Sequence, residues 1–89
     1  MTDDVLNEIF VIRVNQDERW GKQRHSPYKW LAIVQEELGK AAKASLNIDS
    51  PGEKGMETQQ LAIAKLRDQY LQAAAVLIAA VECLDEEVA

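Results

Sequence analysis

The chain lacks the features that typify membrane proteins and disulfide-bonded secreted proteins. It has a single cysteine, so no disulfide can form within it, and the apolar helical stretch around Cys83 predicts a small buried side chain. Its longest uninterrupted apolar run, Ala73–Val81, has nine residues, far short of the roughly 20 that cross a bilayer. Its first residues are acidic, unlike the basic start of a secretory signal peptide. We therefore expect a cytoplasmic protein with no membrane contact.

Basic residues are few and scattered. Ten Lys and Arg residues stand against fifteen Asp and Glu residues, which gives a formal net charge of -5. Proteins that bind a nucleic-acid backbone need clustered Lys and Arg side chains to neutralise its phosphates. We therefore expect no nucleic-acid partner.

The size of the chain predicts one domain and a tendency to associate. Its 89 residues are 47% hydrophobic and 28% charged, a composition typical of a globular protein. A chain this short has room for one core and buries a modest share of its surface, so association of helical subunits is a natural source of stability. We interpret residues 1–89 as a single helical domain.

The first two helices have recognisable ends. Thr2 is a plausible cap for a first helix, and Gly21 is a plausible stop just after Trp20. Ser26 followed by Pro27 is a strong start signal, because a hydroxyl caps the helix and proline takes the first position, where no N–H is needed. The second helix is expected to extend to about Leu46, with an apolar face made by Leu31, Val34, Leu38, Ala41 and Ser45.

Glycine and proline residues bear on the second helix and on the segment that follows it. Gly39 lies in the middle of the second helix, where it weakens the helix by about 1 kcal/mol relative to alanine. We favour close approach of a neighbouring backbone as the reason for it. The segment Asn47–Met56 collects Asn, Asp, Ser, Pro and two glycines, which predicts a loop.

The third helix, expected from about Glu57 to Glu86, is apolar on nearly all sides from Leu71 onward. Three helices cannot surround it, so a partner chain should cover the remainder, and no βαβ pattern is present. The predicted fold class is all-α, with three antiparallel helices that assemble into a four-helix-type core through oligomerisation. One predicted packing seam comprises Leu66, Tyr70, Ala73, Leu77, Ala80 and Leu84, and a second stripe comprises Ile63, Leu71, Ala74, Ile78 and Val81.

Acidic residues near the centre of the chain suggest metal chemistry. Carboxylates three residues apart share a helix face, and two such helices facing each other surround a cleft suited to a hard cation such as Mg²⁺. The stretches ERWGKQRHSPYKWLAIVQEELGKAAKASL and LRDQYLQAAAVLIAAVECL resemble the MazG-like branch of the all-α nucleoside triphosphate pyrophosphatases. The resemblance covers Gln16–Leu84, and its most specific elements are WGxQxH at 20–25, WLAI at 30–33 and EELG at 36–39.

The resemblance implies an assembly, an activity and a substrate-binding edge. The assembly is a homodimer or homotetramer whose helices form a four-helix core, and the activity is Mg²⁺-dependent removal of pyrophosphate from a nucleotide. Trp20, Gln23 and His25 would then bind substrate, with Trp20 stacked on the base and His25 donating to a phosphate. The alternatives are that Trp20 packs the end of the first helix and that His25 is a solvated connector residue. Trp30 is expected in the core.

The same resemblance assigns the catalytic positions, and most of them have changed. The family pattern EExxE falls on Glu36, Glu37 and Lys40, and ExxD falls on Gln69 and Gln72. Only Glu36 and Glu37 remain as metal ligands. Glutamine offers one neutral oxygen, and an ammonium about 4 Å from Mg²⁺ is repelled by ~2 kcal/mol even in bulk water.

Lys40 has two interpretations. As an exposed helical residue it forms an i,i+4 ion pair with Glu36, worth about 0.3–0.5 kcal/mol. As a site residue its charge occupies the vacated metal position, where it neutralises Glu36 and Glu37 or binds a phosphate directly.

Three functions remain open from the sequence. The first is a MazG-like homologue that is catalytically impaired and retained as a nucleotide-binding or oligomeric accessory protein, which needs no cofactor. The second is an active pyrophosphohydrolase that uses Mg²⁺ and a rearranged ligand set of Glu36 and Glu37 with Asp68 or Glu82. The third is a non-catalytic protein-interaction module of a phage or mobile element.

Overall fold

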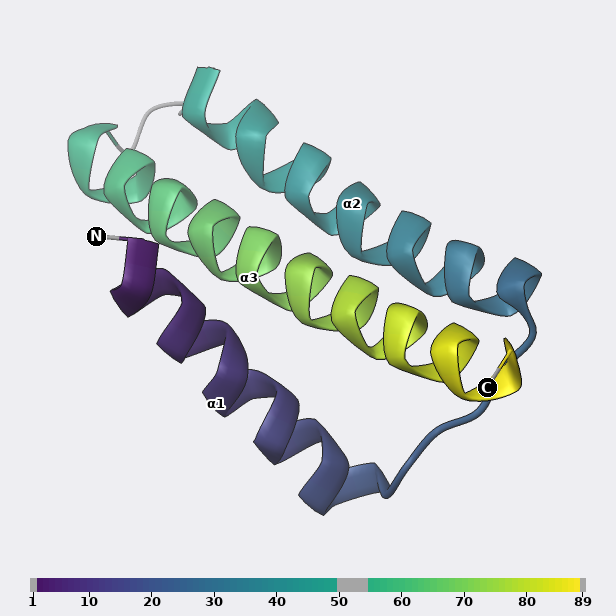
Figure 1. Ribbon diagram of the computed structural model, residues 1–89. Helices are drawn as coiled ribbons and strands as arrows, with labels where there is room; N and C mark the ends of the chain where they lie inside the picture. Colours follow the sequence, from purple (N-terminus) through teal and green to yellow (C-terminus); the bar gives the residue numbers. More distant parts are fainter. Residues whose placement is uncertain (1, 50–54, 89) are drawn as a thin grey trace.

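The computed structural model describes residues 2–49 and 55–88, and these form three helices and no strand. Helix α1 is Thr2–Trp20, α2 is Pro27–Asp49 and α3 is Gly55–Val88. Figure 1 shows α3 lying between the other two helices, with α2 alongside it over most of its length. The all-α class is therefore confirmed. None of the described helices combines the length and the apolar character that a membrane span requires.

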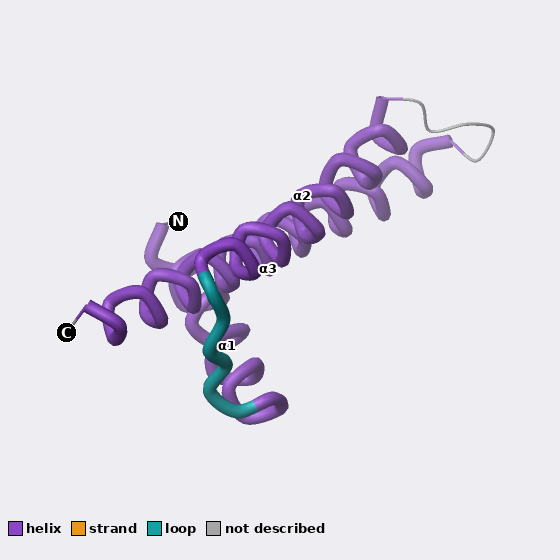
Figure 2. Tube along the Cα trace, turned by 90° about the vertical axis from the view of Figure 1, so that its right-hand side faces the viewer, coloured by secondary structure: helices purple, strands orange, loops and turns teal. Residues whose placement is uncertain are grey.

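The two helix-end signals act as predicted. The Gly21 N–H donates to the Asp17 carbonyl at 2.9 Å, and its φ of 71° is a left-handed conformation that ends α1 at little cost for glycine. The Ser26 hydroxyl accepts a hydrogen bond from the Lys29 N–H at 3.2 Å, and Pro27 is the first residue of α2. Figure 2 shows the connector between them running from the end of α1 to the start of α2.

The predicted loop Asn47–Met56 is wrong at both ends. Helix α2 continues through Asp49 and α3 already begins at Gly55, while residues 50–54 lie outside the described part of the chain. Helix α2 can extend through Asn47–Asp49 because each of these residues has a backbone N–H to donate, and the nearest proline, Pro51, lies beyond them.

Two hydrophobic clusters hold the helices together. Between α2 and α3 the buried residues are Trp30, Val34, Val76 and Cys83, which confirms the core positions expected for Trp30 and Cys83. Between α1 and α3 the buried residues are Ile9, Leu71 and Ala75. Because Ile9 is the single buried residue of α1, that helix is the more weakly packed of the two neighbours of α3.

On α3, every second residue of the first predicted packing seam is replaced in the structure by the residue that precedes it in the sequence. On α3, Tyr70, Leu77 and Leu84 are exposed to 58%, 49% and 52% in the single chain. The buried or half-buried positions repeat at spacings of four and three: Ala62, Leu66, Gln69, Ala73, Val76, Ala80 and Cys83 on α3, and Trp30, Val34, Glu37, Ala41, Ala44 and Ile48 on α2. Small side chains along this seam allow the two helices to pack closely.

The predicted apolar face of α2 and the predicted role of Gly39 also change. Leu31 and Leu38 belong to the predicted face but are exposed, because Trp30 and Glu37 take their places against α3. A Cβ atom on Gly39 would meet nothing within 4 Å, so no neighbouring backbone approaches it among the described residues. In the second predicted stripe of α3, Leu71 is buried but Ile63, Ile78 and Val81 are exposed.

Candidate functional site

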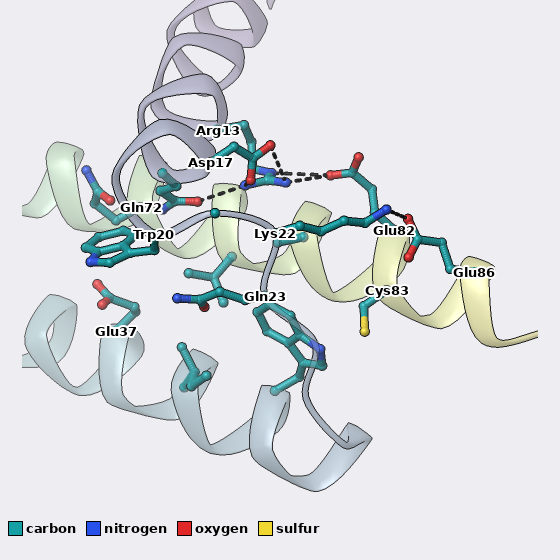
Figure 3. Close-up of a pocket in the computed structure, with 16 residues that line it drawn as sticks. Arg13, Asp17, Trp20, Lys22, Gln23, Glu37, Gln72, Glu82, Cys83 and Glu86 are labelled. Carbon is teal, nitrogen blue, oxygen red and sulfur yellow. Dashed lines mark hydrogen bonds and ion pairs between the residues drawn. The ribbon is translucent and has the colours of Figure 1, made fainter.

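A cavity of about 500 Å³ opens where the end of α1 and the connector face α2 and α3. Figure 3 shows its labelled side chains converging from α1, the connector and both long helices. Its apolar floor comes from α2 and α3 and includes Trp30, Ile33, Val76 and Ala79. The polar lining is Arg13, Gln16, Asp17, Lys22, Gln23, Glu37, Gln72, Glu82 and Glu86, and Trp20 and Gly21 stand at the end of α1.

Arg13 joins α1 to α3 on one wall of the cavity. Its guanidinium donates to Glu82 Oε1 at 2.9 Å, to Asp17 Oδ1 at 3.1 Å and to Gln16 Oε1 at 3.2 Å. Burial of the guanidinium disfavours its charge, but the bonds and charges of Glu82 and Asp17 outweigh that effect and raise the pKa of Arg13. The side chain is only 16% exposed, so this network fixes one wall of the cavity.

Glu86 holds the connector in place. Its two carboxylate oxygens pair with Lys22 Nζ and, at 2.7 Å, with the Arg24 guanidinium. The hydrogen bond from Lys22 is the main reason why the pKa of Glu86 lies below its ordinary value. Two ion pairs therefore join the connector to α3.

The three predicted substrate-binding residues occupy different positions. Trp20 lines the cavity, is 57% exposed and has the Arg19 guanidinium 5.4 Å from its ring centre, so one part of its indole is open to a ligand. Gln23 also lines the cavity. His25 does not, because its ring packs edge-on against Trp30 at 4.9 Å and lies 3.3 Å from Gln23 Oε1.

The predicted catalytic residues are divided between two places. Glu37 and Gln72 line the cavity, and Figure 3 shows the Glu37 carboxylate below the Trp20 indole. Lys40 and Gln69 instead line a groove further along α2 and α3. Glu36 is exposed on another side of α2, as expected from the roughly 100° that separates adjacent helical residues.

The ion pair predicted between Lys40 and Glu36 is not formed. Lys40 Nζ lies 3.4 Å from Glu37 Oε1, an i,i+3 pair. The Glu37 side chain is only 19% exposed because it lies in the seam between α2 and α3, whereas Glu36 is exposed to water. The less solvated carboxylate gains more from the ammonium, which explains the choice of partner.

The donor set of the cavity does not fit Mg²⁺ with a bound phosphate chain. Among residues 2–49 and 55–88, no group of three or more His, Cys, Asp and Glu side chains is arranged to hold a metal ion. Of the two metal ligands predicted, Glu37 faces the cavity and Glu36 does not. Of the two replacement ligands considered, Glu82 lines the cavity but is held by Arg13, and Asp68 lies along the groove with Lys40.

No family model matches the chain, and neither a curated protein nor a solved structure matches it significantly. The MazG-like resemblance therefore rests on the residues that carry it, Trp20–His25, Trp30–Ile33 and Glu36–Gly39.

Most of the charged lining was not predicted from the sequence, although Glu82 was named there as an alternative metal ligand. Arg13 and Asp17 are four residues apart on α1, and Glu82 and Glu86 are four apart on α3, so each pair shares a helix face. That spacing was a usable signal for two charged faces. Their contact was not predictable from it, because Arg13 and Glu82 are separated by 69 residues in the sequence.

Proposed function

We propose that this chain is a MazG-like nucleotide-binding protein that works as a homodimer and has lost ordinary Mg²⁺-dependent hydrolysis. The observation that carries the proposal is the exposed Trp20 indole beside a cavity with an apolar floor. A volume of about 500 Å³ lies within the roughly 300–1,000 Å³ of small-molecule sites. A base stacked on Trp20 would extend over Ile33 and Val76, with the amides of Gln23 and Gln72 available for hydrogen bonds.

The loss of hydrolysis is supported by what occupies the family's ligand positions. Glu37 is engaged by Lys40 at 3.4 Å, so a cation entering there would have to displace an ammonium as well as shed its own water. Gln72 supplies an uncharged oxygen in place of a carboxylate. Binding of a nucleotide without a metal is the function that this donor set favours.

The homodimer is supported by the apolar side chains that the α2–α3 seam leaves exposed. Leu31 and Leu38 on α2 and Tyr70, Leu77 and Leu84 on α3 are each 43–61% exposed. Each of them directly follows a seam residue in the sequence, so on each helix they form a second stripe with the same repeat. A second copy that presents the same two stripes would complete a four-helix core, the arrangement in which antiparallel helix pairs bury such surfaces.

The test is nucleotide binding by the full chain, measured by calorimetry and by quenching of tryptophan fluorescence, with the Trp20→Phe variant separating the signal of Trp20 from that of Trp30, which also lines the cavity. Stacking of a base on an aromatic side chain is worth about 1–3 kcal/mol, so Trp20→Ala should weaken binding roughly five- to 150-fold. Trp20→Phe should retain most of the affinity, and Tyr28→Ala, which removes an aromatic ring that is 85% exposed outside the cavity, should change nothing.

Two results would contradict the proposal. The absence of both a calorimetric signal and a thermal shift with every nucleotide tested would favour a protein-interaction module. Release of pyrophosphate from nucleoside triphosphates at an ordinary enzymatic rate with Mg²⁺ or Mn²⁺ would show that catalysis is retained with Glu37 and other ligands.

A further inference from the structure

We propose that a second, lysine-lined groove beside the cavity binds the phosphate chain of the ligand, so that the ligand is a nucleoside polyphosphate held without a metal. This inference rests on the proposed function for the base end of the ligand. The groove lies between α2 and α3, further along both helices, and has a volume of about 490 Å³. Its lining is Lys40, Lys43, Ala44, Asn47, Ala64, Lys65, Asp68 and Gln69.

The charge of this groove is opposite to that of the whole chain. Lys40, Lys43 and Lys65 face one carboxylate, Asp68, although the chain carries a net charge of -5. Within the described residues, Lys43 and Lys65 form no ion pair or side-chain hydrogen bond, and Lys40 has only the 3.4 Å contact with Glu37. Ammonium groups that are not neutralised by the protein are available to an anion.

The other basic residues that line cavities are already engaged. Arg13 is paired with Asp17 and Glu82, and Lys22 is paired with Glu86. The Trp20 cavity therefore offers aromatic and amide groups but little free positive charge. A ligand with an aromatic end and an anionic end would place its anionic end in the groove.

The groove and the cavity are neighbours along the same two helices. Glu37 and Gln72 line the cavity, while Lys40 and Gln69, one helical turn away on the same helices, line the groove. The rise of about 1.5 Å per residue places Lys43 some 9 Å beyond Glu37 along α2. That distance is comparable with the length of a chain of two or three phosphates.

Gln69 favours anion binding in the groove because its side chain is uncharged. A carboxylate at this position of the groove would repel a phosphate, whereas the amide does not. The same replacements that remove metal ligands therefore leave the groove with excess positive charge. An anion held by lysines alone is bound mainly by Coulomb attraction, so its affinity should fall as salt is added.

The test separates the two ends of the ligand. Calorimetry on the full chain, without metal, would use sodium tripolyphosphate as the probe for the groove and a panel of the four common ribo- and deoxyribonucleosides as the probe for the cavity. Lys43→Gln and Lys65→Gln should each weaken tripolyphosphate binding about fivefold at low salt, the effect of one unit charge at ~4 Å in water. Neither should change nucleoside affinity.

The matched control is Lys29→Gln, which makes the same charge change on an exposed residue of α2 that lines neither space. Tripolyphosphate binding that is absent, or that Lys29→Gln weakens as much as Lys43→Gln does, would overturn the inference. Lysine-dependent tripolyphosphate binding without any nucleoside binding would support the groove while contradicting the proposed function. Nucleoside binding without tripolyphosphate binding would support the proposed function while overturning the inference about the groove.

Discussion

Lys40 Nζ lies 3.4 Å from Glu37 Oε1, one turn back along α2, and leaves Glu36 to the solvent. This contact links the Trp20 cavity, which Glu37 lines, to the lysine groove, which Lys40 lines. It places a positive charge beside Glu37, a carboxylate that lines the cavity.

Adding carboxylates at this point should create a cation site. The double variant Lys40→Glu, Gln72→Asp removes the ammonium and places up to three carboxylates near the cavity, as a hard cation requires. We expect its affinity for Mn²⁺, measured by calorimetry, to exceed that of the parent at least about tenfold, since the substitutions make the local charge three units more negative and one unit charge at ~4 Å from a divalent ion is worth ~2 kcal/mol even in water.

The control for the cation site is Lys29→Glu, Gln60→Asp, which alters net charge equally at exposed positions outside the cavity. An equal gain in both double variants would show that the added affinity comes from net charge. The Lys40–Glu37 pair would then have no specific effect on cation binding.

Acid should loosen the connector and α1. The pKa of Glu86 is lowered mainly by Lys22, and that of Glu8 mainly by its hydrogen bond from Arg67. A carboxylate whose folded-state pKa is depressed contributes stability above its ordinary value of 4.5, and this contribution is lost as pH falls through the lower folded value. The midpoint of urea unfolding should therefore decrease as pH is taken below 4.5.

Glu86→Gln should lower the midpoint of urea unfolding at neutral pH. It should also reduce the further decrease of this midpoint as pH falls below 4.5. Glu87→Gln, a neighbouring exposed carboxylate, should leave the acid dependence intact. If the urea midpoint changes with pH to the same extent in both variants, the Glu86 ion pairs do not stabilise the connector.

Gly39→Ala should stabilise the protein. Gly39 is in the middle of α2 and an added Cβ would meet nothing within 4 Å, so the substitution gains helix propensity without a clash. We expect the free energy of unfolding to rise by about 0.5–1 kcal/mol at a fixed protein concentration. A loss of stability would show that another chain approaches this position in the assembly.

Leu77→Glu should prevent dimerisation. Leu77 is 49% exposed in the stripe that we assign to the partner copy, and a buried carboxylate without a partner would be strongly unfavourable. The parent chain should sediment as a dimer and the variant as a monomer that retains its helical circular dichroism. Leu61 is 56% exposed and lies about 160° around α3 from Leu77, so the control variant Leu61→Glu should remain dimeric. A parent that sediments as a monomer would remove the basis for a four-helix core.

Local signals in the sequence determined the helices and their connector. Gly21 and the Ser26–Pro27 pair set the ends of α1 and α2 through backbone chemistry that involves neighbouring residues only. The long α3 followed from apolar periodicity, and burial of Trp30 and Cys83 followed from their apolar surroundings. The aromatic and amide residues of the cavity, Trp20 and Gln23, were identified by their resemblance motif.

Tertiary structure decided which face of each helix is buried. On α3 two apolar repeats run one residue apart, so periodicity alone could not choose between Val76 and Leu77 or between Cys83 and Leu84. Close packing against α2 favours the smaller member of each pair and leaves the larger one exposed. The same choice turned Glu37 into the seam and Glu36 out of it, and brought Arg13 to Glu82 across 69 residues. The sequence by itself therefore determined the helices, while the rotation of each helix about its axis, which depends on its neighbours, determined the site.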